Sequence, residues 1–503
     1  MNSLPLLSLI IFLPWLGAAA LALLPRLSNN AARGFALAAS LTTLLLGVIA
    51  AAGFDPWAGL QFTEQHPWIP SLHVSWHLGL DGMSLLLVLL TGLVAPAALL
   101  ASRREERDVR LFAILFLLLQ GAALGVFLAL DFFPWFVFWE LSLVPAYFLI
   151  KLWGGPGASR AAYQFVIYTI GGSAFMLAGF AALYAAVGTL DFTQLAALRA
   201  DGTLAARLGG AWSTAVFVGV FLGVAVKVPL FPFHTWLPPA YAEAPTGASM
   251  ILTGVMSKMG VYGFLRILWP LFPAQLHAFA TPLLWLALGS VVLGSLAALR
   301  QRDLKRMIAY SSVNHLGYCL LALFAVASAA TPVPAASASA LSGTLLQVFN
   351  HGLSASALFF CVGVLETRNG GRRGRDDFGG VRTAMPVFAG LCGIAMFSSL
   401  GLPGLNGFVG EFLIFRGVFG LAPWAAAVAC VGLLATALFL LTFWQRVFHG
   451  PQGGGVAAFA DVSRLELVTL LPGVLLMFAL GVWPQLLAGL INPLITGWAG
   501  AMP

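Results

Sequence analysis

Long apolar runs, each followed by a short polar connection, recur from one end of this sequence to the other. A helix rising about 1.5 Å per residue needs about 20 such residues to cross a hydrocarbon core of about 30 Å. Only 9% of the 503 residues are charged, against about 25% in soluble proteins. The sequence therefore predicts an all-α polytopic membrane protein with about 14 transmembrane helices. The runs begin near Leu4, Gly34, Gly82, Leu111, Phe132, Tyr163, Trp212, Thr246, Ala278, Leu304, Leu341, Thr383, Trp424 and Leu467.

Basic residues are distributed unevenly over the connections. Most of the 25 Lys and Arg residues follow odd-numbered runs, whereas the even-numbered connections hold only Arg199, Arg207, Arg266 and Arg416. Because basic connections stay in the cytoplasm, both termini are predicted to be periplasmic. The net charge of +7 then reflects helix flanks, and no nucleic-acid partner is expected.

Two further segments fit this topology. The first run, from Leu4 to Leu24, has no preceding basic residue and no small-residue cleavage site after it, so we interpret it as a spanning helix rather than a cleaved signal peptide. The segment from Phe54 to Gly79 contains aromatic side chains and no Lys or Arg. We expect it to form a periplasmic loop or an interfacial piece.

Six ionisable side chains lie well inside the apolar runs: Glu140, Lys227, Lys258, His315, His351 and Glu411. An acid or lysine in the membrane costs about 2.5–3.5 kcal/mol on insertion scales, so each needs a partner or a water-filled cavity. Counting from the start of each run places all six roughly 12–24 Å deep, near the mid-plane. The six residues are therefore candidates for proton carriers. For His315 or His351 alone, a plain hydrogen bond to a neighbouring helix is an open alternative. Asp131 and Glu243 lie nearer connections and suit capping or loop roles.

Prolines and glycines interrupt two of the runs. Pro229 and Pro232 follow Lys227 directly, and Pro403 precedes Glu411 within GLPGLNGFVGEF. Proline removes a backbone donor, so the seventh and twelfth helices are predicted to be discontinuous and to line ion pathways. Pro403 taken alone also fits ordinary helix packing.

The two interruptions are five helices apart, and an odd displacement reverses direction across the bilayer. This spacing predicts two inverted five-helix repeats. We divide the chain into helices 1–3 (1–110), a first repeat of helices 4–8 (111–270), a second repeat of helices 9–13 (271–450) and a C-terminal helix 14 (451–503). In this alignment Lys227 lies opposite Glu411, and Glu140 opposite His315.

Sequence motifs for other kinds of catalytic or binding site are absent. The chain contains no phosphate-binding loop, dinucleotide fingerprint, nucleophile elbow or metal-ligand cluster. The four cysteines lie inside apolar stretches without CxxC pairing, so we expect buried structural thiols rather than a metal or iron–sulfur site.

Several of these motifs together resemble the antiporter-like proton-pumping subunits of respiratory complex I, the NADH:quinone oxidoreductases. They are FWELSLVPAYFLI, KVPLFPFHTWLPPAYAEAPTGASMILTGVMSKMGVYGFLRI, SSVNHLGY, HGLSASALFF and GLPGLNGFVGEFLIF. Glutamate rather than lysine in VGEF favours the M type, the counterpart of mitochondrial subunit 4. The resemblance is strongest from Phe132 to Arg266 and from Leu304 to Phe415.

The resemblance implies a role for each buried ionisable residue. Glu140 would be the acidic partner of Lys227, and Lys258 the central connecting lysine. His315 and His351 would lie in a hydrated axis that ends at Glu411. Protons would move from cytoplasm to periplasm while quinone is reduced elsewhere in the complex.

The resemblance also implies which cofactors and partner subunits the whole complex would contain. No cofactor would be bound in this chain; NADH, FMN, iron–sulfur clusters and quinone would belong to other subunits. The partners would be membrane lipid and other membrane-arm subunits, including the long lateral helix of subunit L. Two related classes stay open: a multi-subunit cation/proton antiporter and a membrane-bound hydrogenase. A structural spacer that conducts no protons is a third alternative.

Overall fold

The computed structural model describes residues 5–24, 26–453 and 455–501. Within them, thirteen helices are long and apolar enough to cross a membrane, which confirms the all-helical multi-pass fold. These spans are Leu6–Leu23 (α1), Asn29–Ala52 (α2), Gly82–Ala101 (α3), Val109–Leu128 (α4), Phe132–Trp153 (α5 and α6), Ala158–Val187 (α7), Gly210–Lys227 (α10), Thr246–Leu271 (α12 to α14), Ala280–Arg300 (α16), Leu304–Ala327 (α17), Pro334–Arg368 (α18), Pro423–Phe448 (α22 and a π-helical turn) and Arg464–Val482 (α23).

The twelfth predicted run holds two shorter helices instead of one long one. These are α20 (Pro386–Ser399) and α21 (Asn406–Leu421). A count of fourteen spans, the inverted repeats and the domain boundaries therefore stay predictions. The remaining short helices are α8 (Phe192–Ala200), α9 (Thr203–Leu208), α11 (Leu237–Glu243), α15 (Pro273–Ala278), α19 (Val381–Ala384) and α24 (Gln485–Ala501).

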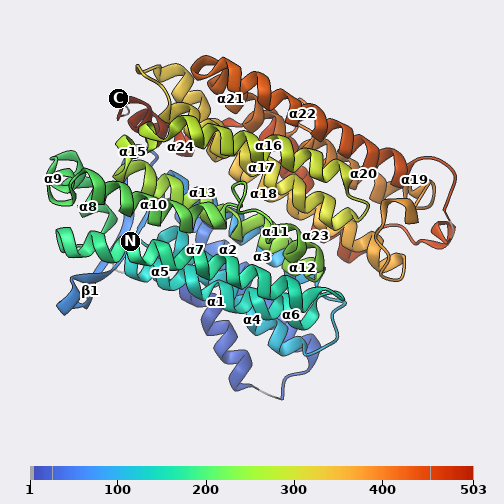
Figure 1. The fold of residues 1–503 in the computed structure, drawn as a ribbon. Coiled ribbons are helices and arrows are strands. Elements are labelled where there is room, and N and C mark those ends of the chain that lie inside the picture. The colour runs from blue at the N-terminus through green and yellow to red at the C-terminus, as the bar shows by residue number, and fades with distance from the viewer. Residues whose placement is uncertain (1–4, 25, 454, 502–503) are drawn as a thin grey trace.

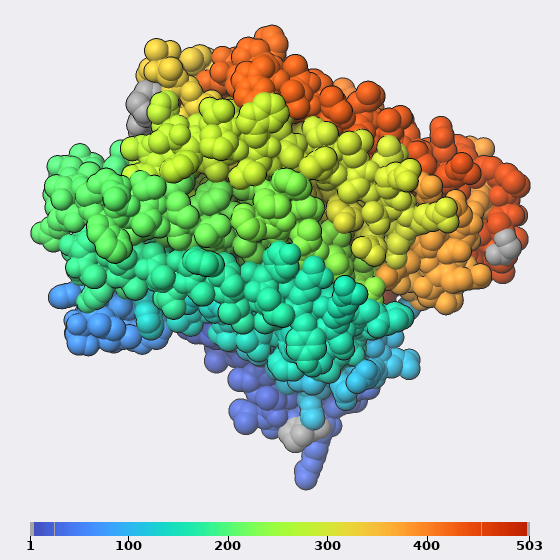
Figure 2. Space-filling view, in the orientation of Figure 1, coloured from blue at the N-terminus to red at the C-terminus, as the bar shows by residue number. Residues whose placement is uncertain are grey.

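The long helices run side by side in two neighbouring groups (Figure 1). Helices α4 to α7 lie in the lower part of that view and α20 to α22 in the upper part, while α13 (Lys258–Gly263), α17 and α18 lie between them. Helices α17 and α18 are buried along nearly their whole length, because they pack against each other and are covered by α3, α11, α16, α20, α21 and α24. The N-terminal region projects from the lower edge of the molecule (Figure 2). The interior between the two groups is therefore the place where buried polar groups can meet.

The segment predicted to be a loop or interfacial piece contains a β-hairpin. Strand β1 (Gln61–Ile69) pairs antiparallel with β2 (Val74–Leu80). The hairpin lies beside the start of α1, where the Glu64 carboxylate accepts a hydrogen bond from the Leu7 amide at 2.7 Å. The second strand, VSWHLGL, alternates apolar residues with Ser75, His77 and Gly79, which is a strand signal in the sequence. The first strand, QFTEQHPWI, has no such alternation.

Two buried aspartates fasten the hairpin to the helices. Asp131 caps α5 by accepting from the Phe133 amide at 3.0 Å, as predicted, and it also accepts from the Ser75 amide at 3.0 Å. Asp191 Oδ2 lies 2.5 Å from His77 Nδ1. Burial alone would raise the pKa of Asp191, but hydrogen bonds from His77 and Thr193 hold it below its usual value.

Basic connections that are far apart in sequence meet on the opposite side of the molecule. Arg104 follows the third span and Arg368 ends α18, yet both reach the Glu466 carboxylate, at 3.5 and 2.7 Å. Glu243 takes the loop role expected of it, because its carboxylate accepts from the Gly157 amide at 2.9 Å. The structure thus gathers on one face connections that the charge pattern assigns to the cytoplasm.

Two expectations need correction or extension. Cys319, Cys361 and Cys392 are buried, but Cys430 is exposed on α22 and is not the buried thiol we expected. A helical period repeats every 3.6 residues, so a cysteine within an apolar run can face lipid as easily as protein. The C-terminal region also contains a second helix, α24, after the predicted one.

Candidate functional site

Lys227 lies where the seventh span breaks. It is the last residue of α10, and the chain then turns through Pro229 and Pro232 before α11 begins at Leu237. The indole of Trp236 donates to the Val226 carbonyl at 2.9 Å, which satisfies an acceptor that the break leaves free. The predicted discontinuity of this helix is confirmed.

The Lys227 ammonium faces an interruption in the fifth span. Helix α5 (Phe132–Leu141) and helix α6 (Leu143–Trp153) meet at Ser142. Lys227 Nζ donates to Ser142 Oγ at 3.4 Å and lies 4.9 Å from the centre of the Trp139 ring. Pro145 could have predicted the interruption, because proline cannot donate to the carbonyl four residues earlier.

Lys258 lies at the start of α13 (Lys258–Gly263), one residue after a π-helical turn, Leu252–Met256, ends. It is fully buried, at 0% exposure. Its ammonium donates to the Thr253 carbonyl at 2.7 Å and to Ser257 Oγ at 3.3 Å, and lies 2.8 Å from His351 Nδ1. The three donors of a lysine ammonium therefore have three acceptors, provided that His351 Nδ1 carries no proton.

The two histidines continue the row from Lys258. The His315 and His351 rings lie 5.1 Å apart, centre to centre, and tilt by 36°. His315 Nδ1 is 2.9 Å from Glu411 Oε1. Gln347 Nε2 donates to the same carboxylate oxygen at 3.2 Å. Lys258, His351, His315 and Glu411 thus form a sequence of neighbouring protonatable groups across the molecular interior.

Glu411 lies beside the break in the twelfth span. Helix α20 ends at Ser399 and α21 begins at Asn406, so Pro403 lies in the gap, as predicted. Gly401 approaches Glu411 so closely that an added Cβ would lie 2.8 Å from Oε2. Asn350 Nδ2 donates to the Asn406 carbonyl at 2.6 Å, which ties the break to α18. The Glu411 carboxylate therefore lies against backbone that is outside the two helices.

Four uncharged polar residues beside the row were not predicted from the sequence. Ser142, Thr253, Gln347 and Asn350 are all buried and contact the predicted residues or their helices. Uncharged polar residues are common in membrane helices, where they bond to neighbouring helices, so composition alone did not single these four out.

Two links in the predicted row are open. Within the part of the chain that the structure describes, no ion pair joins Glu140 to Lys227 and no hydrogen bond joins Lys227 to Lys258. Glu140 is half-buried and lines an open groove of about 690 Å³ together with Tyr147 and Tyr163. The pairing of Glu140 with Lys227 therefore stays a prediction.

The arrangement suits proton transfer better than a reaction that makes or breaks covalent bonds in a substrate. The His315 Nε2 atom and the Gln347 Oε1 atom are buried without a hydrogen-bond partner among the described residues. An unpaired polar atom is costly in a low-dielectric interior, so each of these two atoms would be stabilised by a further hydrogen-bond partner. Over residues 5–24, 26–453 and 455–501, no three His, Cys, Asp or Glu side chains gather where they could hold a metal ion.

Comparison with known proteins gives a consistent result. Residues 129–438 match the family described as NADH:quinone oxidoreductase/Mrp antiporter, TM. NADH-quinone oxidoreductase subunit M of Rhodobacter capsulatus is 37% identical over 499 residues, covering 97% of this chain and 95% of the relative. The M subunit of Mycobacterium tuberculosis is 33% identical and covers 98% and 94%.

Solved structures agree with these relatives. A chain of respiratory complex I from Thermus thermophilus with bound NADH superposes with a TM-score of 0.87 at 31% identity, covering 99% of this chain and 100% of that one. The Mrp complex from Dietzia sp. gives a TM-score of 0.82 at 21% identity, with 99% and 98% coverage. At that identity the second match shows only a shared fold.

Proposed function

We propose, since the chain belongs to the family of NADH-quinone oxidoreductase M subunits, that its buried row of ionisable residues is a route for protons through complex I. As a member of that family the chain is a proton-translocating membrane subunit of the complex. The proposal concerns which residues carry the protons. It also holds that this subunit binds no redox cofactor, and that NADH, FMN, iron–sulfur clusters and quinone belong to other subunits.

The observation that carries the proposal is the link from Lys258 through His351 and His315 to Glu411. Successive groups are 2.8 Å apart from Lys258 to His351 and 2.9 Å apart from His315 to Glu411, while the two imidazole rings face each other. Four ionisable residues in apolar surroundings are costly to bury, and a purely structural role would not need them at one depth. Adjacent donors and acceptors are what proton transfer requires.

The row runs along the membrane plane, so access to both faces is needed. Helix breaks supply it in the proposed route: one follows Lys227 and the other precedes Glu411. Non-helical backbone at membrane depth is tolerated where it borders protein or water. In this route a proton from the cytoplasm reaches Lys227 and Lys258, crosses the two histidines, and leaves near Glu411 toward the periplasm.

Electron transfer elsewhere in the complex would drive the transfer through charge. A change in the charge near Glu140 alters the field at Lys227, because opposite charges stabilise each other over several ångströms in a poorly screened interior. Each proton that moves along the row then changes the field at the next group. Neighbouring membrane-arm subunits, the lateral helix of subunit L and membrane lipid would surround the chain in a bacterial inner membrane, with both termini periplasmic.

Exchanging Glu411 for glutamine tests this proposal. Glutamine has nearly the same shape but cannot carry the proton, so NADH-driven proton uptake by inverted membrane vesicles is expected to fall roughly threefold or more. Glu106→Gln removes the same charge from an exposed position on the basic side and should leave uptake at the wild-type level. Wild-type uptake in an assembled Glu411→Gln complex would rule out Glu411 as a carrier.

A sodium/proton antiporter function is the second candidate, because the matching family covers both complex I and Mrp antiporters. The two are separated by the chains that co-purify and by the driving reaction. Proton transfer that depends on NADH oxidation and not on sodium supports the complex I route. Sodium-dependent exchange without an NADH-oxidising module would support the alternative.

A further inference from the structure

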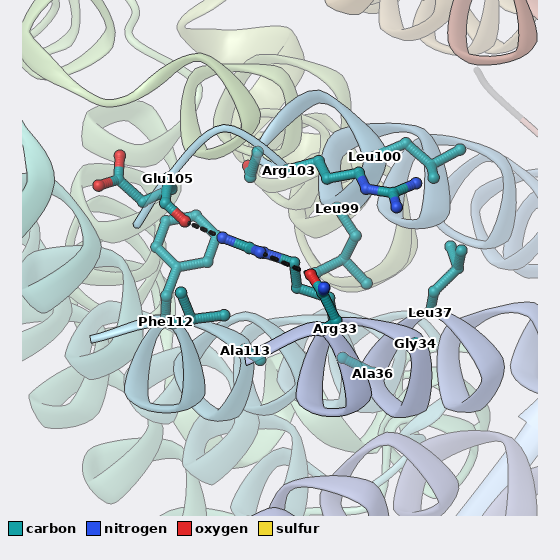
Figure 3. Close-up of a pocket in the computed structure, with 13 residues that line it drawn as sticks. Arg33, Gly34, Ala36, Leu37, Leu99, Leu100, Arg103, Glu105, Phe112 and Ala113 are labelled. Atoms are coloured by element: carbon teal, nitrogen blue, oxygen red, sulfur yellow. Dashed lines mark hydrogen bonds between the residues drawn. The ribbon is translucent and has the colours of Figure 1, made fainter. Parts of the chain in front are cut away.

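A small pocket lined by both apolar and charged residues lies where α2, α3 and α4 meet on the basic side of the molecule. It has a volume of about 130 Å³, and its polar lining includes Asn30, Arg33, Ser102 and Arg103. Figure 3 shows Arg33 rising from α2 into the pocket and Arg103 lying across from it. The Glu105 side chain carries its carboxylate away from both guanidinium groups in the same view. The pocket therefore presents positive charge.

Both guanidinium groups have N–H donors that bond to none of the described residues. Arg33 donates to Asn30 Oδ1 at 3.2 Å and to the Glu105 carbonyl at 2.5 Å, while its buried Nε has no partner. The Arg103 guanidinium is exposed and makes no hydrogen bond or ion pair to any residue that the structure describes. Arginine binds phosphate through two parallel hydrogen bonds, so the pocket offers a site for an anionic oxygen group.

An apolar groove continues from this pocket toward the mid-plane. It has a volume of about 360 Å³ and shares Leu37 and Leu100 with the pocket. Its walls include Leu37 to Leu44 of α2, Leu93 to Leu100 of α3 and Val468 to Leu476 of α23. Seven or eight helical residues extend about 10–12 Å, most of one leaflet of a hydrocarbon core about 30 Å thick.

We propose that the pocket and groove together bind one anionic glycerophospholipid of the cytoplasmic leaflet. Its phosphate would lie between Arg33 and Arg103, and an acyl chain would fill the groove. Charge complementarity at one end and a leaflet-deep apolar channel at the other fit this ligand, whereas a free phosphate ion would leave the groove empty. A protein helix would bring apolar side chains to the groove but no anionic group placed between the arginines.

The bound lipid would cover part of the proton route. The groove is lined by Leu353, two residues after His351 on α18, and by Met250, which lies in the same span as Lys258. An acyl chain in the groove would therefore keep bulk lipid and water away from the outer side of the two helices that hold the Lys258–His351 contact. This site does not depend on the direction or order of the proposed proton transfers.

Photocrosslinking of the intact complex in lipid nanodiscs tests the site. The probe is phosphatidylglycerol with a photoactivatable acyl chain, and labelled peptides are mapped by mass spectrometry. We expect labelling of residues 37–44, 93–100 and 468–476. Labelling in Arg103→Gln is expected to be about tenfold lower, because a charge-assisted phosphate contact is lost.

Several controls separate the possible outcomes. Arg306→Gln removes an exposed arginine from the same side, away from the pocket, and should label like the wild type. Ala97→Trp fills the groove without touching the arginines and should abolish labelling. A phosphatidylcholine probe should label about tenfold less than phosphatidylglycerol, since its head group has no net charge. Excess inorganic phosphate should not compete.

Three results would overturn the proposal. Equal labelling by both lipids and in Arg103→Gln would show ordinary surrounding lipid. Competition by inorganic phosphate would show an anion pocket without a lipid. Absence of labelling in the three segments of the wild-type complex would show that another protein chain covers the groove.

Discussion

Lys258→Met is expected to lower NADH-driven proton uptake at least about tenfold in an assembled complex. Methionine has a similar length and suits an apolar interior, so packing around α13 should survive. It cannot hold a proton, however, and it leaves His351 Nδ1 without the ammonium that now lies 2.8 Å away. NADH oxidation should fall with uptake, because the two processes are coupled. Both rates are measured on the same inverted vesicles.

The matched control for this substitution is Lys151→Met. Lys151 lies in the last turn of α6 and donates to the hydroxyls of Tyr147 and Tyr163, outside the buried row. Its loss should leave proton uptake within experimental error of the wild type. If Lys258→Met assembles and pumps normally, the central lysine is not a carrier and the route through the histidines is wrong.

Gly260→Ala is expected to disrupt the site through packing rather than charge. Gly260 lies two residues after Lys258, and an added Cβ would come within 2.6–2.7 Å of the backbone of Val228, the residue after Lys227. Backbone cannot yield as a flexible side chain does, so α13 must shift away from the broken helix. Overpacking of this kind costs about 1–3 kcal/mol. We expect a lower thermal unfolding temperature of the purified complex and a severe loss of proton uptake.

Gly171→Ala provides the comparison, because a Cβ at Gly171 meets no atom within 4 Å. An exposed glycine inside a helix is less favourable than alanine by about 1 kcal/mol, so this variant should be as stable as the wild type or slightly more so. Equal stability and activity in the Gly260 and Gly171 variants would show that neither stability nor proton uptake depends on the close packing of α13 against the helix break after Lys227.

The sequence predicted the features that the bilayer imposes. Apolar length predicted the spans except in the twelfth run, which holds two shorter helices. The cost of burying charge singled out Lys227, Lys258 and Glu411 as residues in need of a special environment. Prolines marked both helix breaks, since a missing backbone donor acts locally. These inferences depend on one residue and its neighbours in sequence, which is why they could be made without coordinates.

Features that depend on tertiary contacts were not predictable in this way. The π-helical turn before Lys258 shifts the register of the helix that holds Lys258 by one residue. No local sequence pattern predicts such a turn. The contact of Gln347 with Glu411 joins residues 64 positions apart. The expected pairing of Glu140 with Lys227 came from resemblance alone and is not formed as an ion pair among the described residues. Glu140 instead lines an open groove at the surface of α5 and α6.

NADH-driven proton uptake by inverted vesicles carrying Glu140→Gln, with NADH oxidation and assembly recorded on the same sample, tests most directly whether the row conducts protons. Glutamine keeps the shape of the side chain while removing the charge proposed to act on Lys227. If the row is a conduction route coupled to electron transfer, uptake and oxidation both fall while the complex stays assembled. Wild-type rates of both would contradict the account and favour a subunit that only supports the membrane arm.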